Sequence, residues 1–182
     1  MEREMSGSRH AGLTLLEMMA ALAVAAIGAS LALPDLGRMV ERQRLRSHAM
    51  ALTGSLRHAR GEALRLNRPV FLCAANLKVN RELQGCQPAL GGARQSWPEG
   101  ALIYADQGAA NGYYDSGERL SLAMFDGEHV QVFASARQLS WTPEGRLRQP
   151  QRFQLKGRSQ CLDLMVEATG RVWQGEVRND CG

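Results

Sequence analysis

Hydrophobic residues follow two different patterns in the first third of the chain. From Leu13 to Leu33, 21 residues carry a single charge, that of Glu17. As an α-helix with about 1.5 Å per residue, this run is roughly 30 Å long, enough to cross the core of a bilayer. Further on, apolar residues recur at steps of four and three, the spacing of one face of an amphipathic helix. They are Leu45, Ala49, Leu52, Leu56, Ala59, Ala63 and Leu66.

Together the two patterns predict one long helix from Leu13 to Leu66. Its first part is apolar on all sides, and its second part is amphipathic. Pro34 lacks a backbone N–H, so we expect it to kink the helix. The sequence Asn67-Arg68-Pro69 predicts the end of the helix, because a residue before proline disfavours the helical conformation.

After Pro69 the chain changes to short runs with alternating polarity, separated by turn-forming residues such as Asn111-Gly112 and Asp126-Gly127. The fold class predicted is α+β: a long N-terminal helix packed on an antiparallel β domain, with the apolar stripe covered by a sheet. The predicted strands are Val70–Ala74, Ala101–Ala105, Leu120–Phe125, Val130–Phe133, Leu139–Thr142, Phe153–Lys156, Leu162–Glu167 and Val172–Val177.

The composition is that of a folded, mildly basic chain. Of its 182 residues, 45% are hydrophobic, and the formal net charge is +4, which argues against disorder. Among the 22 basic residues only Lys78 and Lys156 are lysines. Arginine forms bidentate contacts with phosphate and carboxylate groups, but a GC-rich genome would also favour arginine codons.

Four cysteines form two local pairs in the sequence, 13 and 20 residues apart. Three connectivities are possible. We favour the disulfides Cys73–Cys86 and Cys161–Cys181, because each closes a short loop. Their spacing does not fit a zinc site, and an even number of cysteines indicates an oxidising compartment.

The lone acid of the apolar run carries the most specific signal, since an acid in hydrocarbon normally has a partner and a function. Gly12 stands directly before Leu13-Thr14-Leu15-Leu16-Glu17, and Pro34 follows the run. This arrangement resembles the type IV prepilin signature, although phenylalanine is commoner at the position of Leu13. The resemblance implies that prepilin peptidase cleaves between Gly12 and Leu13 and methylates the new N-terminus.

In type IV pilins the acid and the new amine serve in assembly, so the resemblance implies that Glu17 and Pro34 are assembly residues. Glu17 of one subunit would neutralise the amine of Leu13 on its neighbour, and this pair would set the register of the subunits. An alternative is that Glu17 pairs only with its own amine. Two other interpretations of the segment are a secretory signal peptide with a cleavage site at Ser30-Leu31-Ala32 and a plain membrane anchor.

Later segments narrow the resemblance to the GspH/FimT group of minor pilins and pseudopilins. They are Ala59-Arg60-Gly61-Glu62-Ala63, Trp97-Pro98-Glu99-Gly100, then Asp106, Asn111-Gly112, Asp115 and Gly117-Glu118, and finally Cys161 with Gly170-Arg171. Such proteins are thought to lie near the filament tip and to prime assembly with the other minor pilins and the major pilin.

The resemblance also implies an organisation of the chain. Residues 1–12 would form the leader, 13–33 the transmembrane or filament-core helix, 34–68 its amphipathic part, and 69–182 a periplasmic β domain. The protein would span the inner membrane once before it enters a pilus or pseudopilus.

A metal site and an enzyme active site are two further possibilities for this chain. The acidic segment Asp106–Glu118 does not fit an EF-hand, because Gly108 and Ala110 occupy ligand positions, so we expect an acidic turn and no metal site. We also expect no cofactor and no enzymatic activity, because the sequence contains no catalytic triad order, phosphate loop or paired-carboxylate motif.

DNA is the remaining candidate partner. Six basic residues lie between Arg137 and Arg158, near aromatic residues that could stack on bases. Some FimT-like proteins bind DNA through a Gly-Arg-x-Arg motif near the C-terminus. Here the matching segment is Gly170-Arg171-Val172-Trp173, which lacks the second arginine, whereas the earlier Gly145-Arg146-Leu147-Arg148 fits the pattern. The DNA-binding candidates are therefore Arg146, Arg148 and Arg171.

The sequence thus predicts a minor pilin that takes part in the initiation or tip assembly of a type IV pilus. The alternative is a minor pseudopilin of a type II secretion system. A DNA-binding minor pilin in DNA uptake is a further alternative.

Overall fold

The computed structural model describes most of the chain in two compact units, Met1–Gly37 and Arg38–Gly182. The predicted processing residues Gly12 and Leu13 lie outside the described residues, and the side chains of residues 31–35 are also not described. The described ranges are 14–88, 91–92, 94–107 and 111–181.

One helix, α1 (Leu15–Leu66), contributes to both units. It ends at the predicted residue, and the helix continues through Pro34, so the kink expected there stays a prediction. Within the described residues, no helical stretch combines the length and the apolar character that crossing a membrane requires.

The second part of α1 buries the stripe that the sequence predicts. Leu45, Ala49, Leu52, Leu56, Ala59 and Ala63 are all fully buried, and Leu66 packs against the same core while partly exposed. Burial of a leucine side chain stabilises a fold by about 1.5–3 kcal/mol, so this stripe holds the domain on the helix.

All strand pairs are antiparallel, and the strands form two sheets. In the first sheet the order is β2-β1-β4-β5, and β7 also pairs with β1. These strands are β1 (Val70–Leu77), β2 (Leu83–Cys86), β4 (Gly100–Tyr104), β5 (Arg119–Met124) and β7 (Gln138–Trp141).

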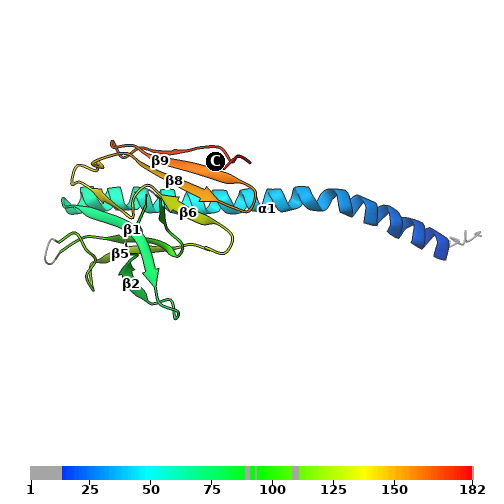
Figure 1. The fold of residues 1–182 in the computed structure, drawn as a ribbon, viewed down its shortest axis with the longest axis horizontal. Helices are drawn as coiled ribbons and strands as arrows, with labels where there is room; N and C mark the ends of the chain where they lie inside the picture. The colour runs from blue at the N-terminus through cyan, green and yellow to red at the C-terminus, as the bar shows by residue number, and fades with distance from the viewer. Residues whose placement is uncertain (1–13, 89–90, 93, 108–110, 182) are drawn as a thin grey trace, which may run out of the picture. The chain divides into compact units, whose positions relative to one another are not determined.

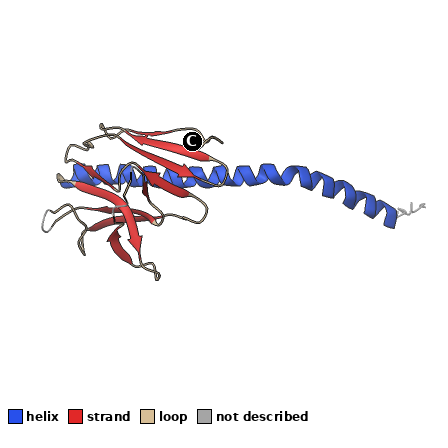
Figure 2. Ribbon diagram, in the orientation of Figure 1, coloured by secondary structure: helices blue, strands red, loops and turns tan. Residues whose placement is uncertain are grey.

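The second sheet has the order β10-β9-β8-β6-β3. In the view of Figures 1 and 2, β8 and β9 lie above the domain part of α1, and β1, β2 and β5 lie below it. The strands of the second sheet are β3 (Gln95–Ser96), β6 (Gln131–Ala134), β8 (Gln151–Lys156), β9 (Cys161–Val166) and β10 (Val172–Gln174).

Large aromatic residues fill the space between the helix and the sheets. Trp97, Trp141 and Phe153 are fully buried, and the rings of Trp97 and Phe153 meet edge to face at 5.2 Å. They belong to one core cluster with the helix stripe and with residues of both sheets. This confirms the α+β fold class, with a long helix packed on antiparallel sheets.

Every predicted strand has a counterpart, and the structure adds β2 and β3. The last strand is shorter than the prediction of Val172–Val177, because it ends at Gln174. Beyond it the chain still follows β9: the Gly175 N–H donates to the Asp163 carbonyl at 2.8 Å, and Arg178 forms a bridge with Cys161.

Candidate functional site: an exposed helix and a cluster of arginines

In the first unit, large apolar side chains of α1 are exposed. Leu15 is 80% exposed, and Val24 is 71% exposed. Contiguous apolar surface of this kind usually marks a contact with another protein or with a membrane. The other large exposed apolar residues of this unit are Leu16, Met18, Met19, Leu22, Ile27 and Leu36.

Glu17 lies on this exposed part of α1, in the first helical turn. Its backbone N–H donates to the hydroxyl of Thr14 at 3.3 Å, so Thr14 caps the helix and Glu17 is the third helical residue. A negative charge at this position also complements the helix dipole. Among the described residues, no partner of the Glu17 carboxylate is found.

Of the predicted processing and assembly residues, the structure describes Glu17 and the backbone of Pro34. Gly12 and Leu13, the predicted cleavage site, lie outside the described residues, so the distance from Glu17 to the Leu13 amine is not defined. Pro34 lies within α1, and its side chain is not described.

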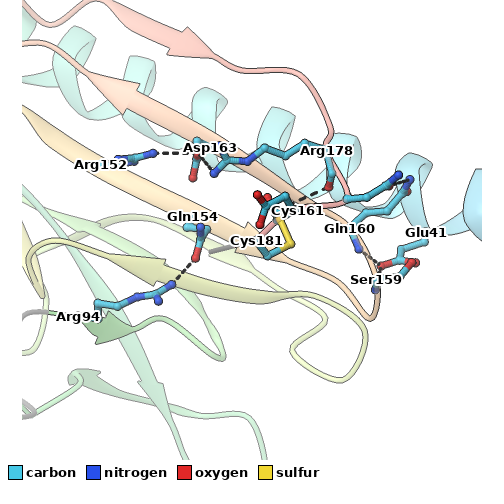
Figure 3. The surroundings of a disulfide bond; sticks show 12 residues. Glu41, Arg94, Arg152, Gln154, Ser159, Gln160, Cys161, Asp163, Arg178 and Cys181 are labelled. Carbon is cyan, nitrogen blue, oxygen red and sulfur yellow. Dashed lines mark hydrogen bonds and ion pairs between the residues drawn. A yellow bond between two sulfur atoms is a disulfide. The ribbon is translucent and has the colours of Figure 1, made fainter.

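Both disulfides that the sequence analysis favours are present. Cys73 on β1 bonds to Cys86 on β2, and Cys161 on β9 bonds to Cys181 near the C-terminus, with a Cα–Cα distance of 5.7 Å in each. The first closes the β1–β2 hairpin, and the second ties the C-terminal segment to β9 (Figure 3).

A carboxylate that the sequence analysis did not single out joins α1 to the second sheet. Glu41 accepts hydrogen bonds from the backbone N–H groups of Ser159 (2.6 Å) and Gln160 (2.9 Å) and from the Ser159 hydroxyl (2.7 Å), as Figure 3 shows. Burial raises the pKa of Glu41, but these hydrogen bonds outweigh that effect and place the pKa below its ordinary value.

The structure brings the two Gly-Arg segments together. The Leu147 N–H donates to the Ala168 carbonyl at 2.9 Å, so the turn that holds Arg146 and Arg148 lies beside the turn that precedes Arg171. The side chains of all three arginines are exposed, while Leu147 between the first two is buried. The three DNA-binding candidates therefore lie close together, although Arg171 follows Arg146 by 25 positions in the sequence.

Gly170 is needed at this place for a steric reason. Its φ is +83°, and a Cβ there would lie 2.7 Å from the Gly145 carbonyl oxygen and 2.9 Å from Nε of Arg60. Arg60 of α1 also donates to the Gly170 carbonyl at 3.3 Å. The glycine of the Gly-Arg pair thus allows the turn to pack against the helix.

Trp173 occupies the position of the second arginine in the Gly-Arg-x-Arg pattern. The Arg171 guanidinium stacks on the Trp173 ring at 3.7 Å, and the Trp173 indole N–H donates to Glu167 at 2.7 Å. Not every basic residue between Arg137 and Arg158 is free to act with Arg146, Arg148 and Arg171. Arg152, for example, pairs with Asp163 at 3.0 Å.

The acidic segment Asp106–Glu118 uses its carboxylates to hold its own backbone. Asp106 accepts from the Gly112 N–H at 2.6 Å, and Glu118 accepts from the N–H groups of Gln107 and Asp115 at 2.7 and 2.9 Å. The Tyr104 hydroxyl donates to the Gly112 carbonyl at 2.9 Å, and burial of this tyrosine raises its pKa. Oδ1 of Asp106 is buried without a hydrogen-bond partner among the described residues, and residues 108–110 lie outside them, so the expected absence of a metal site stays a prediction.

Three side chains of types that can ligate a metal lie together in the β5–β6 turn. Asp126, Glu128 and His129 place one ligand atom each within 4.8 Å of one another, and all three are exposed. His129 pairs with Asp126 at 2.8 Å, and the pKa of Asp126 is lowered by this hydrogen bond. The Asp126 N–H donates to Nε2 of His48 on α1 at 3.1 Å, which attaches the turn to the helix.

The fold is that of a type IV pilin-like subunit. A crystal structure of the type IV minor pilin FimU from Pseudomonas aeruginosa (strain PAO1) superposes with a TM-score of 0.52 at 20% identity, over 79% of this chain and 99% of that chain. A second crystal form of FimU gives a TM-score of 0.49 at 20% identity, over 76% and 100% of the two chains. At this identity the likeness concerns the fold alone.

The family follows from the sequence match. The family model described as type II transport protein GspH matches residues 48–170, and the prokaryotic N-terminal methylation motif matches residues 7–33. The chain belongs to the GspH family and is a minor pilin or pseudopilin of the GspH/FimT type. No curated protein matches it. The family and the fold are those of structural proteins rather than enzymes, and they imply assembly with other pilin-like subunits.

Proposed function

We propose that this protein is a minor pilin that joins other minor pilins to initiate or cap a type IV pilus. The observation that carries the proposal is the exposed apolar part of α1 with Glu17 as its acid, inside a segment that matches the N-terminal methylation motif. In this proposal residues 13–33 anchor the chain in the inner membrane, and the β domain lies in the periplasm until the helix enters the filament.

In this proposal, a charge pair between Glu17 and the Leu13 amine is needed when α1 moves from the bilayer into the filament. After cleavage behind Gly12, Leu13 carries a positively charged amine in apolar surroundings. Glu17 of one subunit accepts the charge-assisted hydrogen bond of the amine on the next subunit. Neither charge is then left unpaired in a region of low dielectric constant, so a misaligned helix is penalised. Pro34 softens the helix where its apolar part ends.

The variant Glu17→Gln tests the role of the charge. The cap uses the backbone N–H of residue 17, which glutamine keeps, so the helix start is preserved while the carboxylate is lost. We expect normal cleavage after Gly12 and a loss of about tenfold in the amount of this protein in purified pili. Glu17→Asp, which keeps the charge, is the matched control. Undiminished incorporation of the glutamine variant would show that the charge has no role in assembly.

A second candidate function is that of a minor pseudopilin in type II secretion. It is favoured by the description of the family model that matches residues 48–170, which names a type II transport protein. Deletion of the gene separates the two functions. Loss of surface pili with intact secretion of exoproteins supports the pilus, whereas the reverse phenotype supports the secretion system.

DNA binding is a third candidate function, and the adjacency of Arg146, Arg148 and Arg171 favours it. Three exposed guanidinium groups on two touching turns can contact successive phosphates of a nucleic-acid backbone. The test is a gel shift at increasing salt with the full chain in detergent. The double variant Arg146→Ala/Arg148→Ala should bind about tenfold more weakly, with a shallower salt dependence. Equal binding of this variant and the wild type would exclude the site.

A further inference from the structure

The outer face of the second sheet carries a row of three large side chains. The strand register places Arg152 of β8 opposite Met165 of β9, and Met165 opposite Trp173 of β10. These side chains point away from the core, because the alternate positions point into it: Phe153, Leu164 and Val166 are buried, and Val172 packs against the core. Met165 and Trp173 are both 46% exposed, which is high for two adjacent large apolar residues on a sheet.

Beside this row lies a groove of about 300 Å³, which we call the Trp173 groove. Gly175 lines it, and the Gly175 N–H donates to the Asp163 carbonyl at 2.8 Å. A groove of this size accommodates one or two side chains of a partner. It is lined by Arg152, Asp163, Met165, Trp173, Gln174 and Gly175.

The rim of the groove is positively charged. Arg152 and Arg178 both donate to the same oxygen of Asp163, so one carboxylate faces two guanidinium groups (Figure 3). Arg171 lies against one face of Trp173 at 3.7 Å, and the indole N–H is bound to Glu167. Arg152 thus lines the groove, while Arg178 and Arg171 contact two of its lining residues, Asp163 and Trp173.

We propose that the Trp173 groove docks a segment of another pilin-like subunit in which an apolar side chain stands next to an acidic one. The apolar side chain would pack on Met165 and Trp173, and the acid would pair with Arg152 or Arg178. Tryptophan, methionine and arginine are the residue types enriched at the centres of protein interfaces. This inference rests on the proposed function, since it takes its partner from the assembly in which the protein acts.

Charge and shape favour such a peptide over a nucleic acid at this groove. A phosphate backbone would meet the carboxylates of Asp163 and Glu167, and Asp163 already holds Arg152 and Arg178 in hydrogen bonds. Arg152 and Arg178 carry two positive charges, and Asp163 neutralises only one of them. A peptide with one acidic side chain can pair with the remaining charge, while its apolar side chain covers Met165 and Trp173.

The test is photo-crosslinking of the full chain in cells that assemble pili. A p-benzoylphenylalanine residue replaces Gln174 in the groove, and in a control chain it replaces Tyr113, which is exposed on the Asp106–Glu118 loop. Mass spectrometry identifies the crosslinked peptide. We expect an acidic segment of another pilin-like subunit to be attached at position 174 and not at position 113.

Two substitutions of Met165 then test the charge. In the chain with the crosslinker at position 174, Met165→Glu should lower the yield about tenfold, because its carboxylate repels an acidic partner, whereas Met165→Lys should retain most of it. Equal losses in both variants would overturn the inference, as would an adduct with DNA alone. A chain that enters filaments but gives no adduct overturns the inference and leaves the proposed function standing. A wild-type chain that is absent from filaments overturns both.

Discussion

Glu41 on α1 holds the turn between β8 and β9 by accepting three hydrogen bonds, two of them from Ser159. The two residues are 118 positions apart. A Cβ at Gly157 in the same turn would lie 2.4 Å from a Glu41 carboxylate oxygen, so a side chain there would displace the carboxylate. This contact fixes the second sheet on the helix near the start of the domain.

The variant Glu41→Gln should lower the free energy of unfolding by about 1–2 kcal/mol, because hydrogen bonds to a charged acceptor are stronger than those to a neutral one. The pKa of Glu41 lies below its ordinary value of 4.5 in the folded protein. Its contribution is therefore complete above about pH 4.5 and is lost as the pH falls through the folded-state pKa. Thermal unfolding of the full chain in detergent between pH 3 and 7 measures how the stability difference between wild type and Glu41→Gln depends on pH. Glu176→Gln, at an exposed position, is the control. A difference between wild type and Glu41→Gln that does not shrink at low pH would contradict the prediction.

Gly170→Ala should destabilise the domain by about 2 kcal/mol or more. A methyl group at this position would collide with the Gly145 carbonyl and with Arg60, in addition to the backbone strain at positive φ. Gly112→Ala isolates the strain, because Gly112 has a φ of +75° and open space around its Cβ position. If both variants unfold at the same denaturant concentration, the steric argument is wrong.

Leu52 lies in the fully buried stripe of α1. Leu52→Ala should cost about 2–5 kcal/mol, because it leaves a cavity in the core. Leu64→Ala lies on the same helix but is 51% exposed, and it should cost less than about 1 kcal/mol. Chemical denaturation of the full chain compares the two, and similar losses would mean that the helix packs through another face.

The Cys73–Cys86 disulfide should stabilise the domain by about 2–4 kcal/mol, because it closes a short loop in the unfolded chain. The double variant Cys73→Ser/Cys86→Ser should therefore melt at a lower temperature than the wild type. Reducing agent should lower the melting temperature of this variant further, through Cys161–Cys181. A variant that is insensitive to reductant would show that the second disulfide does not form.

Local patterns in the sequence predicted the elements that depend on neighbouring residues. The spacing of Leu45, Leu52 and Leu56 located the buried helix face because helical periodicity is a local property. Two strands were missed for local reasons too. β3 has only two residues, and β2 contains Gly85, which weakens a strand pattern.

The contacts that define the surfaces come from distant parts of the chain. Glu41 with Ser159, Arg60 with Gly170, and Met165 beside Trp173 are placed by the strand register and by packing on the helix. No spacing in the sequence encodes these pairs. The sequence therefore predicted Arg146, Arg148 and Arg171 as candidates, but only the structure shows that their turns touch.

The central claim is that the N-terminal helix is kept and used as the assembly element of the mature subunit. The intact mass of the protein extracted from purified pili or membranes tests it most directly. We expect a chain that begins at Leu13 with one methyl group on its amine. A chain that begins at residue 33, or one that still carries Met1, would contradict it.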